Sequence, residues 1–398
     1  MQIKILKPAS VVFFTLLANG LSNYTTSLEL LSKTHSTFSF GIGLVTGPLV
    51  GLILATPITR LLKKFNNHKL ATIGLIGATL SIFIYGWAVN TDKYLFAFAI
   101  IFLVFNGAFM RLFNYAYMSN QLYIVGEKNI QKLNSLEQGS ISILKIINPA
   151  IAAIIWGIIG LQQSLFIAVI ISLLGLYILK NVTYPTKNDH NISTSNQKKP
   201  GFIKTMATIK KNRIVNRIFI LESLTGILFV SEIVALPYIL VHENIITSQN
   251  LGLIQGIIGF GSVIGAIVAY RKKVKNTLST LKYTTVAVGT LYILLAATFY
   301  QVIYPITIIF VAVIGVLIGM LNTFSGPIGY SKLQLVLSDD DRSDVLTWYF
   351  TVQELVYPIG SILVSSLLNV ISSTTIYLLY GLSIIAIGWL TMKGVNHE

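Results

Sequence analysis

Long apolar runs separated by short polar turns dominate the chain. Twelve of these runs are long enough to cross a bilayer, whose ~30 Å hydrocarbon core needs about 20 apolar residues per helix. They fall into two sets of six, one on each side of a polar stretch, and they predict an all-α polytopic membrane protein. The runs are residues 11–31, 38–58, 70–89, 94–118, 141–159 and 161–179, then 218–241, 250–270, 283–300, 302–329, 345–368 and 372–392.

The polar stretch divides the chain into three predicted parts. We expect an N-terminal six-helix bundle over residues 1–180, a cytoplasmic linker over 181–213 and a C-terminal six-helix bundle over 214–398. The second part of the linker places Phe202, Met206 and Ile209 near helical spacing, with lysines between them. This spacing predicts a short amphipathic helix on the membrane interface. A solvated tether is the alternative.

The two sets of spans resemble each other in detail. The fourth span of each set has a glycine and a serine at the same spacing, and each fifth span has a proline. These residues are Gly107, Ser119 and Pro149 in the first set, and Gly319, Ser331 and Pro358 in the second. We therefore expect two bundles related by a pseudo-two-fold axis along the membrane normal. That arrangement is typical of secondary transporters, which carry small molecules along a central path.

A net charge of +15 could indicate a nucleic-acid partner, so the position of the basic residues decides its meaning. Of the 29 Lys and Arg residues, Lys33 and Lys93 lie on the predicted outer side, and Arg111 and Lys145 lie within spans. The others lie on one side, which indicates that both termini are cytoplasmic. We expect a cell-membrane protein whose basic residues contact anionic lipid rather than nucleic acid.

The sequence lacks the residues that several kinds of chemistry require. The chain has no cysteine, which excludes disulfides and thiolate metal sites. Its five histidines fall in predicted loops or at the terminus, so no histidine is available for a metal site or a proton relay within a span. We expect no metal, no cofactor and no enzymatic activity. The short outer turns leave no external domain for a large partner, and we expect a monomer that handles a small molecule.

Two charges occupy matching places in the fifth span of each set. Lys145 lies four residues before Pro149, and Glu354 lies four residues before Pro358. Each charge is about ten residues from the cytoplasmic end of its helix, or ~15 Å at 1.5 Å per residue. The pair could face a water-filled cavity, or it could form a structural ion pair between helices. The sequence leaves both alternatives open.

Arg111 and Glu222 are further charges within spans. One central charge costs ~2.5–3.5 kcal/mol, so four unpaired charges facing lipid would cost on the order of 10 kcal/mol. They must therefore face water or one another. Burial in an apolar wall favours the protonated form of a carboxyl group, which makes Glu222 the first candidate for a proton-coupling site. The other candidates for this role are Glu354, Glu232 and Glu29.

Polar and aromatic residues near these charges are candidates for lining a substrate cavity. They are Arg111, Asn106, Asn114, Tyr115, Tyr117, Lys145 and Tyr357. A packing role in the helix bundle is the alternative for each aromatic residue, and a structural role is the alternative for Arg111.

Several short segments resemble the major facilitator superfamily, over essentially the whole chain. They begin at Phe113-Asn-Tyr-Ala, Leu133-Asn-Ser-Leu-Glu, Asn148-Pro-Ala, Gly201-Phe-Ile-Lys and Val356-Tyr-Pro-Ile-Gly. Within the superfamily the chain resembles the twelve-span drug:proton antiporters that include the macrolide efflux proteins. The resemblance implies alternating access, with the first, fourth, seventh and tenth helices lining the cavity. It also implies that Arg111, Glu222 and Glu232 point inward and that Lys145 and Glu354 lie near the interface of the halves.

The chain departs from the family pattern in its second loop, which lacks the usual acidic residue before its basic cluster. The tenth loop instead carries an acidic cluster. We hypothesise that the two loops pair and close a cytoplasmic gate. The gate candidates are Arg60, Lys63, Lys64, Asp339, Asp340, Asp341 and Asp344. Exchanging Asp339–Asp341 for asparagine is then expected to favour the inward-open state.

These observations lead to one functional expectation with two alternatives. The leading expectation is proton-coupled efflux of small amphipathic compounds or drugs, with Glu222 carrying the proton. Uptake of a small nutrient or metabolite on the same scaffold is the first alternative, because the spans supply both carboxylates for a cationic cargo and cations for an anionic one. A membrane sensor or enzyme is the second, and the sequence offers it no catalytic cluster.

Overall fold

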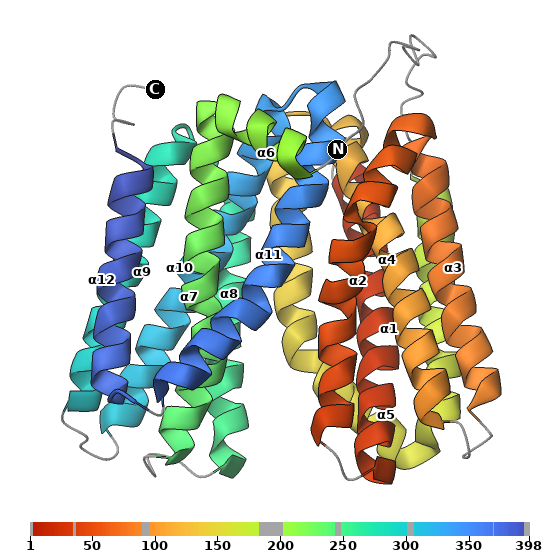
Figure 1. Ribbon diagram of the computed structural model, residues 1–398, viewed down its shortest axis with the longest axis horizontal. Coiled ribbons are helices and arrows are strands. Elements are labelled where there is room, and N and C mark those ends of the chain that lie inside the picture. The colour runs from red at the N-terminus through yellow and green to blue at the C-terminus, as the bar shows by residue number, and fades with distance from the viewer. Residues whose placement is uncertain are drawn as a thin grey trace. The chain divides into compact units, whose positions relative to one another are not determined.

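The computed structural model describes residues 3–34, 37–89, 95–182, 202–242, 248–300, 306–368 and 370–393. Within these ranges the regular secondary structure is entirely α-helical (Figure 1). The helices are α1 (Ile3–Thr34), α2 (Thr37–Lys64), α3 (Asn67–Ala88), α4 (Leu95–Val125), α5 (Ile130–Lys180), α6 (Phe202–Lys211), α7 (Arg213–His242), α8 (Ser248–Arg271), α9 (Thr277–Tyr300), α10 (Ile306–Val336), α11 (Asp339–Leu368) and α12 (Ser373–Thr391).

Helix α5 contains two spans. Gly160 interrupts it with φ 77° and ψ 179°, a conformation that favours glycine because a Cβ atom would clash with the backbone. The break falls between the two apolar runs predicted at 141–159 and 161–179. With α5 counted as two helices and the short α6 left aside, the twelve predicted spans are confirmed.

The surface of the helices is suited to lipid. In the described part of the chain nine helices, α5 taken as one, are long and apolar enough to cross a membrane. Large apolar side chains lie fully on the outside, among them Ile158 and Leu390 at 76% and 74% exposure. In hydrocarbon no water is available to hydrogen-bond the backbone N–H and C=O groups, and an α-helix pairs these groups with one another. The chain is therefore a multi-pass membrane protein.

The chain forms two compact units that are not continuous in sequence. Unit 1 contains Met1–Leu133, Leu144–Thr208 and Leu337–Thr351, and unit 2 contains Asn134–Ile143, Ile209–Val336 and Val352–Glu398. The segment Asn134–Ile143 of α5 thus belongs to unit 2, although the rest of that helix belongs to unit 1. The first residues of α11 belong to unit 1, and the rest of that helix to unit 2.

Unit 1 is held together by close contact between α3 and α4. A Cβ atom at Gly74 would lie 2.5 Å from the backbone nitrogen of Phe113, so only glycine permits this approach. Leu75 and Phe113 belong to one apolar cluster, and the rings of Tyr85 and Phe102 stack at 4.6 Å in a second. In lipid the hydrophobic effect does not drive helices together. Small residues at such crossings let the helices pack closely, and van der Waals contacts then stabilise the pair.

Unit 2 also has glycine residues at two helix crossings, where they let the backbones approach closely. Helices α9 and α12 meet where a Cβ atom at Gly381 would lie 2.6 Å from the carbonyl oxygen of Gly289. Helix α8 meets α10 where Gly261 and Gly265 face backbone carbonyl groups of α10. The glycines of α8 therefore bring two helix backbones into contact, and larger residues at these positions would separate them.

One pair of polar residues supports the internal repeat. Ser119 and Ser331, which the repeat aligns, are both buried in their helices. Each hydroxyl group donates a hydrogen bond to the carbonyl oxygen four residues earlier, Ser119 to Tyr115 and Ser331 to Pro327. The two fourth spans therefore share the sequence spacing and also the local hydrogen bond.

The α8–α10 crossing gives a testable prediction. Replacing Gly265 with alanine places a methyl group against the carbonyl group of Met320, and such overpacking typically costs about 1–3 kcal/mol. We expect a lower melting temperature of the purified protein in detergent. Gly256→Ala in the same helix is the matched control, because nothing lies within 4 Å of its Cβ position. Equal melting temperatures for the two variants would contradict the proposed contact.

Candidate functional site

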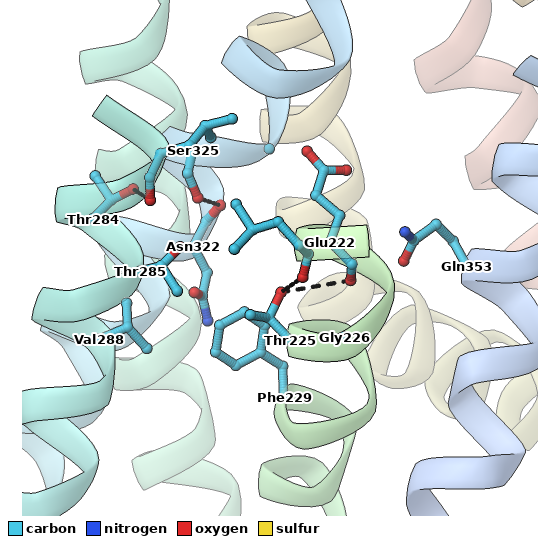
Figure 2. A pocket seen from close by; sticks show the side chains of 13 residues that line it. Glu222, Thr225, Gly226, Phe229, Thr284, Thr285, Val288, Asn322, Ser325 and Gln353 are labelled. Atoms are coloured by element: carbon cyan, nitrogen blue, oxygen red, sulfur yellow. Dashed lines mark hydrogen bonds between the residues drawn. The ribbon is translucent and has the colours of Figure 1, made fainter. Parts of the chain in front are cut away.

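Glu222 of α7 lines a cavity within unit 2 (Figure 2). The cavity has a volume of about 180 Å³ and is bounded by α7, α9, α10 and α11. Its lining residues are Leu221, Glu222, Thr225, Gly226, Phe229, Leu281, Thr284, Thr285, Val288, Asn322, Ser325, Gly326 and Gln353. Among these residues of the described chain, Glu222 alone carries an ionisable side chain.

Helical spacing explains why these side chains share one cavity. Residues three, four and seven apart lie on the same face of a helix. The lining residues of α7 follow this spacing from Glu222 to Phe229, those of α9 from Leu281 to Val288, and those of α10 from Asn322 to Gly326. Sequence analysis did not identify the lining residues of α9 and α10. Their polar residues recur at helical spacing within apolar spans, and this pattern could have identified them.

Three hydroxyl groups of the cavity donate their protons to their own helices. Thr225 Oγ1 donates to the carbonyl oxygen of Leu221 at 2.7 Å, and Thr284 Oγ1 donates to that of Thr280 at 2.9 Å. Ser325 Oγ donates to the carbonyl oxygen of Asn322 at 3.1 Å. Each hydroxyl oxygen retains lone pairs as acceptors.

A glycine of α10 provides the space for the Glu222 side chain. A Cβ atom at Gly329 would clash with Oε1 of Glu222, so a side chain there would collide with the carboxyl group. Gly226 similarly lets α11 approach α7, since its Cβ position lies 3.3 Å from Oε1 of Gln353. The carboxyl group is thus fixed by the close approach of helices.

The unit 1 candidates divide into buried and half-buried residues. Tyr115 and Tyr117 are each 1% exposed and belong to the apolar cluster around Phe113. The Tyr115 hydroxyl group bonds Thr351 Oγ1 at 3.0 Å. The Tyr117 hydroxyl group donates to a backbone carbonyl of α1 at 2.8 Å. Both tyrosine hydroxyl groups are thus bonded inside unit 1.

The polar candidates of α4 lie close to α1 and α2. The buried Asn106 amide donates to Asn19 Oδ1 at 2.8 Å. Arg111 is half-buried, and its Nη2 lies 3.3 Å from the Cβ position of Gly47 in α2. Asn114 is half-buried. Arg111 and Asn114 are three residues apart and therefore share one face of α4.

The remaining membrane candidates lie in different surroundings. Lys145 is exposed in unit 1, and Glu354 is half-buried in unit 2. Glu29 accepts a hydrogen bond from Trp156 Nε1 at 2.7 Å, which gives its carboxylate a partner inside unit 1. The side chains of Glu232 and Tyr357 lie outside the described residues.

Two of the gate candidates, Lys63 and Asp344, form an ion pair in unit 1. Lys63 Nζ lies 2.5 Å from Asp344 Oδ2, and the two side chains are 20% and 8% exposed. Asp339 instead pairs with Arg342 of its own helix at 2.8 Å. Asp341 accepts a hydrogen bond from Ser338 Oγ at 3.0 Å, which caps α11.

Asp339 and Asp341 bond within the start of α11, so Asp344 is the acidic candidate that contacts Lys63. Helical spacing explains the difference. Asp344 lies on a buried face of α11, whereas Asp340 is exposed, as are Arg60 and Lys64 in α2. The rotation of α11 determines which carboxylate faces Lys63.

No group of three or more potential metal ligands occurs among the residues that the structure describes. The charged groups instead occur singly or in pairs. The arrangement provides the carboxyl group of Glu222 beside a cavity in unit 2, the half-buried guanidinium group of Arg111 in unit 1 and the Lys63–Asp344 ion pair at the start of α11.

Comparison with known proteins places the chain among membrane transporters. The family described as Major Facilitator Superfamily matches residues 9–361. No curated protein sequence matches the chain. Three solved structures share its fold over nearly the whole length at low identity, which is evidence for the fold alone.

The first of these structures is the E. coli fucose:proton symporter FucP, at 16% identity and a TM-score of 0.72, covering 100% of this chain and 99% of that chain. The second is the human organic anion transporter MFSD10 (TETRAN), at 12% identity and a TM-score of 0.72, covering 97% of this chain and 99% of that chain. The third is a bacterial homologue of the iron transporter ferroportin, at 12% identity and a TM-score of 0.70, covering 97% of each chain.

The Lys63–Asp344 pair gives a testable prediction. Asp344→Asn removes a charge-assisted bond of about 1.5–3 kcal/mol and leaves Lys63 without its carboxylate. The start of α11 should then open more often. Because the chain has no cysteine, Thr347→Cys, which is 1% exposed, provides a single reporter thiol. We expect a membrane-impermeant maleimide to label it about tenfold faster in the Asp344→Asn background, when added on the side of the membrane at which α11 begins.

Asp340→Asn is the control for this prediction, because it removes the same charge from an exposed position of the same helix. It should leave the labelling rate unchanged. If both substitutions accelerate labelling equally, the net charge of the segment controls α11 and the specific ion pair does not.

Proposed function

The chain belongs to the Major Facilitator Superfamily, and from this premise we propose a proton-coupled exporter of small amphipathic compounds that works by alternating access. Membership makes the protein a transporter and not an enzyme. The single observation that supports proton coupling is the enclosed carboxyl group of Glu222. We further propose that the protein is a monomer of the cell membrane, with both termini cytoplasmic.

A carboxyl group in this position has a physical reason to exchange a proton. Charge within a membrane span is costly, and protonation removes it. Glu222 is held against Gly329 on one side and lines a small cavity on the other, so a proton can reach it without lipid contact. Protonation and release would change the charge of unit 2 by one elementary charge in each cycle. Such a change can favour one conformation of a transporter over another.

The cavity at Glu222 is too small for the cargo itself. Pockets for drug-sized molecules typically measure about 300–1,000 Å³, against about 180 Å³ here. We therefore assign coupling to this cavity and cargo binding to other residues. Arg111, with Asn106 and Asn114 on the same helix, is the proposed contact for the cargo in unit 1. Lys145 and Tyr357 stay candidates for the same role.

We propose that the starts of α5 and α11 act as the cytoplasmic gate. Asn134 of α5 donates to Ser331 Oγ and to Gln334 Oε1 of α10 within unit 2, both at 2.8 Å. The start of α11 is tied within unit 1 by Lys63 and Asp344. Both helices continue in the other unit. We propose that these bonds break and form again during the transport cycle.

Uptake of a small nutrient or metabolite is the second candidate function. The half-buried Arg111 favours it for an anionic cargo, because a guanidinium group binds carboxylates and phosphates in bidentate geometry. One protein of the same fold is a fucose:proton symporter, and another is an organic anion transporter. The direction of transport separates the two candidates. Proteoliposomes with a defined orientation and an imposed pH gradient measure it directly.

The role of Glu222 gives the principal functional prediction. Glu222→Gln keeps the size of the side chain but cannot release a proton. We expect the variant to lose transport driven by a pH gradient, down to the level of empty liposomes, and to retain binding of the cargo. A panel of labelled compounds in proteoliposomes provides the measurement. Glu127→Gln is the control, because Glu127 is exposed in the turn after α4. Full pH-driven transport in Glu222→Gln would reject the assignment.

A further inference from the structure

We propose that Lys282 of α9 and Trp389 of α12 form a binding site for the phosphate group of one anionic phospholipid. Both residues belong to unit 2, and neither lines the cavity beside Glu222. The inference is therefore independent of the proposed function. It also goes beyond a general attraction of basic residues to lipid, because it assigns one lipid to one pair of side chains.

Close packing of α9 against α12 brings the two side chains together. The Cβ position of Gly388 in α12 lies 3.1 Å from Cγ2 of Thr285 in α9. Trp389 directly follows this glycine, and Lys282 lies one helical turn before the threonine. The Lys282 ammonium group lies 3.8 Å from the centre of the Trp389 ring. Helix packing therefore sets the position of the cation beside the indole ring.

Lys282 is a buried cation with no carboxylate beside it. It is 6% exposed, and its ammonium group contacts only the Trp389 ring among the residues that the structure describes. The sequence explains this isolation. No aspartate or glutamate occurs at 244–338 or 355–397, which include α9 and the helices α10 and α12 packed against it. Buried charges in proteins are normally paired, so we expect the anion to come from outside the chain.

The pair offers hydrogen-bond donors and no acceptors. A lysine ammonium group has three N–H donors, and an indole ring has one. Within the described part of the chain, none of these N–H groups of Lys282 and Trp389 has an acceptor. The charged oxygens of a phosphodiester only accept hydrogen bonds, and bonds between charged partners are among the strongest. The chemistry of the pair therefore matches a phosphate group.

The depth of the site in the membrane favours a lipid over a free phosphate ion. Lys282 directly precedes the apolar run 283–300, and Trp389 lies near the end of the run 372–392. Tryptophan is enriched at this level of a bilayer, where the headgroups meet the hydrocarbon. Trp389 and Leu390 are 54% and 74% exposed, so they offer an apolar surface to acyl chains beside the cation. A free phosphate ion would gain nothing from that surface.

Neighbouring cations favour an anionic headgroup over one with a fixed positive charge. Figure 1 shows that α7 and α9 begin at the end of unit 2 where α12 ends. Arg217 Nη2 of α7 donates a hydrogen bond to the carbonyl oxygen of Lys393 at 2.6 Å, which places its guanidinium group beside the end of α12. The Lys393 side chain is exposed there. Basic residues at a membrane surface attract acidic lipids, and each further charge adds to the attraction.

Titration of the purified full-length protein with phosphatidylglycerol, followed by native mass spectrometry, tests the proposal. We expect one phosphatidylglycerol to bind more tightly than any that follow, and about tenfold more tightly than phosphatidylcholine. The lipid should also raise the melting temperature of the lipid-depleted protein, because a ligand of the folded state stabilises it. An equal concentration of inorganic phosphate should not displace the lipid, since phosphate lacks the acyl chains.

Substitutions separate this site from the other basic residues. Lys282→Met keeps the length of the side chain without its charge, and we expect the affinity for phosphatidylglycerol to fall about tenfold, as for loss of one bond to a charged group. Lys282→Arg should retain the binding. Trp389→Phe keeps an aromatic ring without the N–H donor and should weaken binding severalfold, which tests the site even if Lys282→Met does not fold. Lys275→Met is the matched control, because Lys275 is exposed just before α9.

Several outcomes would overturn the lipid site. Equal affinities of Lys282→Met and Lys275→Met for phosphatidylglycerol would mean that net charge alone attracts the lipid. A lower melting temperature of Lys282→Met with unchanged lipid affinity would mean that Lys282 only ties α9 to α12. Equal binding of phosphatidylcholine would reject the preference for an anionic headgroup, and displacement by inorganic phosphate would reject a lipid as the ligand. None of these results affects pH-driven transport through Glu222.

Discussion

The cost of placing polar groups in hydrocarbon governs this structure. Each polar or charged side chain within a span must find a partner, a cavity or a second helix, because lipid supplies no hydrogen bonds. The chain meets this requirement in different ways. Glu29 bonds Trp156, Asn106 bonds Asn19, and Glu222 lies in a cavity against Gly329. The apolar residues that cover the outside are a consequence of the same constraint.

Close packing at glycine residues makes these arrangements possible. Glycine brings the backbones of α8 and α10 into contact and clears the space for the carboxyl group of Glu222. Packing of this kind holds each unit together where the hydrophobic effect contributes little between helices. The same residues thus serve stability and the proposed coupling site. A bulky substitution at Gly329 would therefore affect both.

The starts of α5 and α11 connect the fold to the proposed mechanism. The segment Asn134–Ile143 of α5 belongs to unit 2 and the start of α11 belongs to unit 1, while the remainder of each helix belongs to the other unit. The bonds that fix them are polar: the Asn134 amide in unit 2 and the Lys63–Asp344 pair in unit 1. Polar bonds at such positions can exchange for water when they break. On the proposed mechanism, this property lets a transporter move between states without exposing apolar surface.

The sequence by itself determined the number of spans, the break at Gly160 and the class of protein. These features depend on the length of apolar runs, on glycine conformation and on charge placement, all of which are local. The tertiary structure decided which polar residues share a cavity and that Asp344, and not Asp339 or Asp341, faces Lys63. It also decided that the hydroxyl groups of Tyr115 and Tyr117 are bonded inside unit 1. The physical reason is helix rotation: a turn of one helix about its axis changes every side-chain partner, and contacts with neighbouring helices set that rotation.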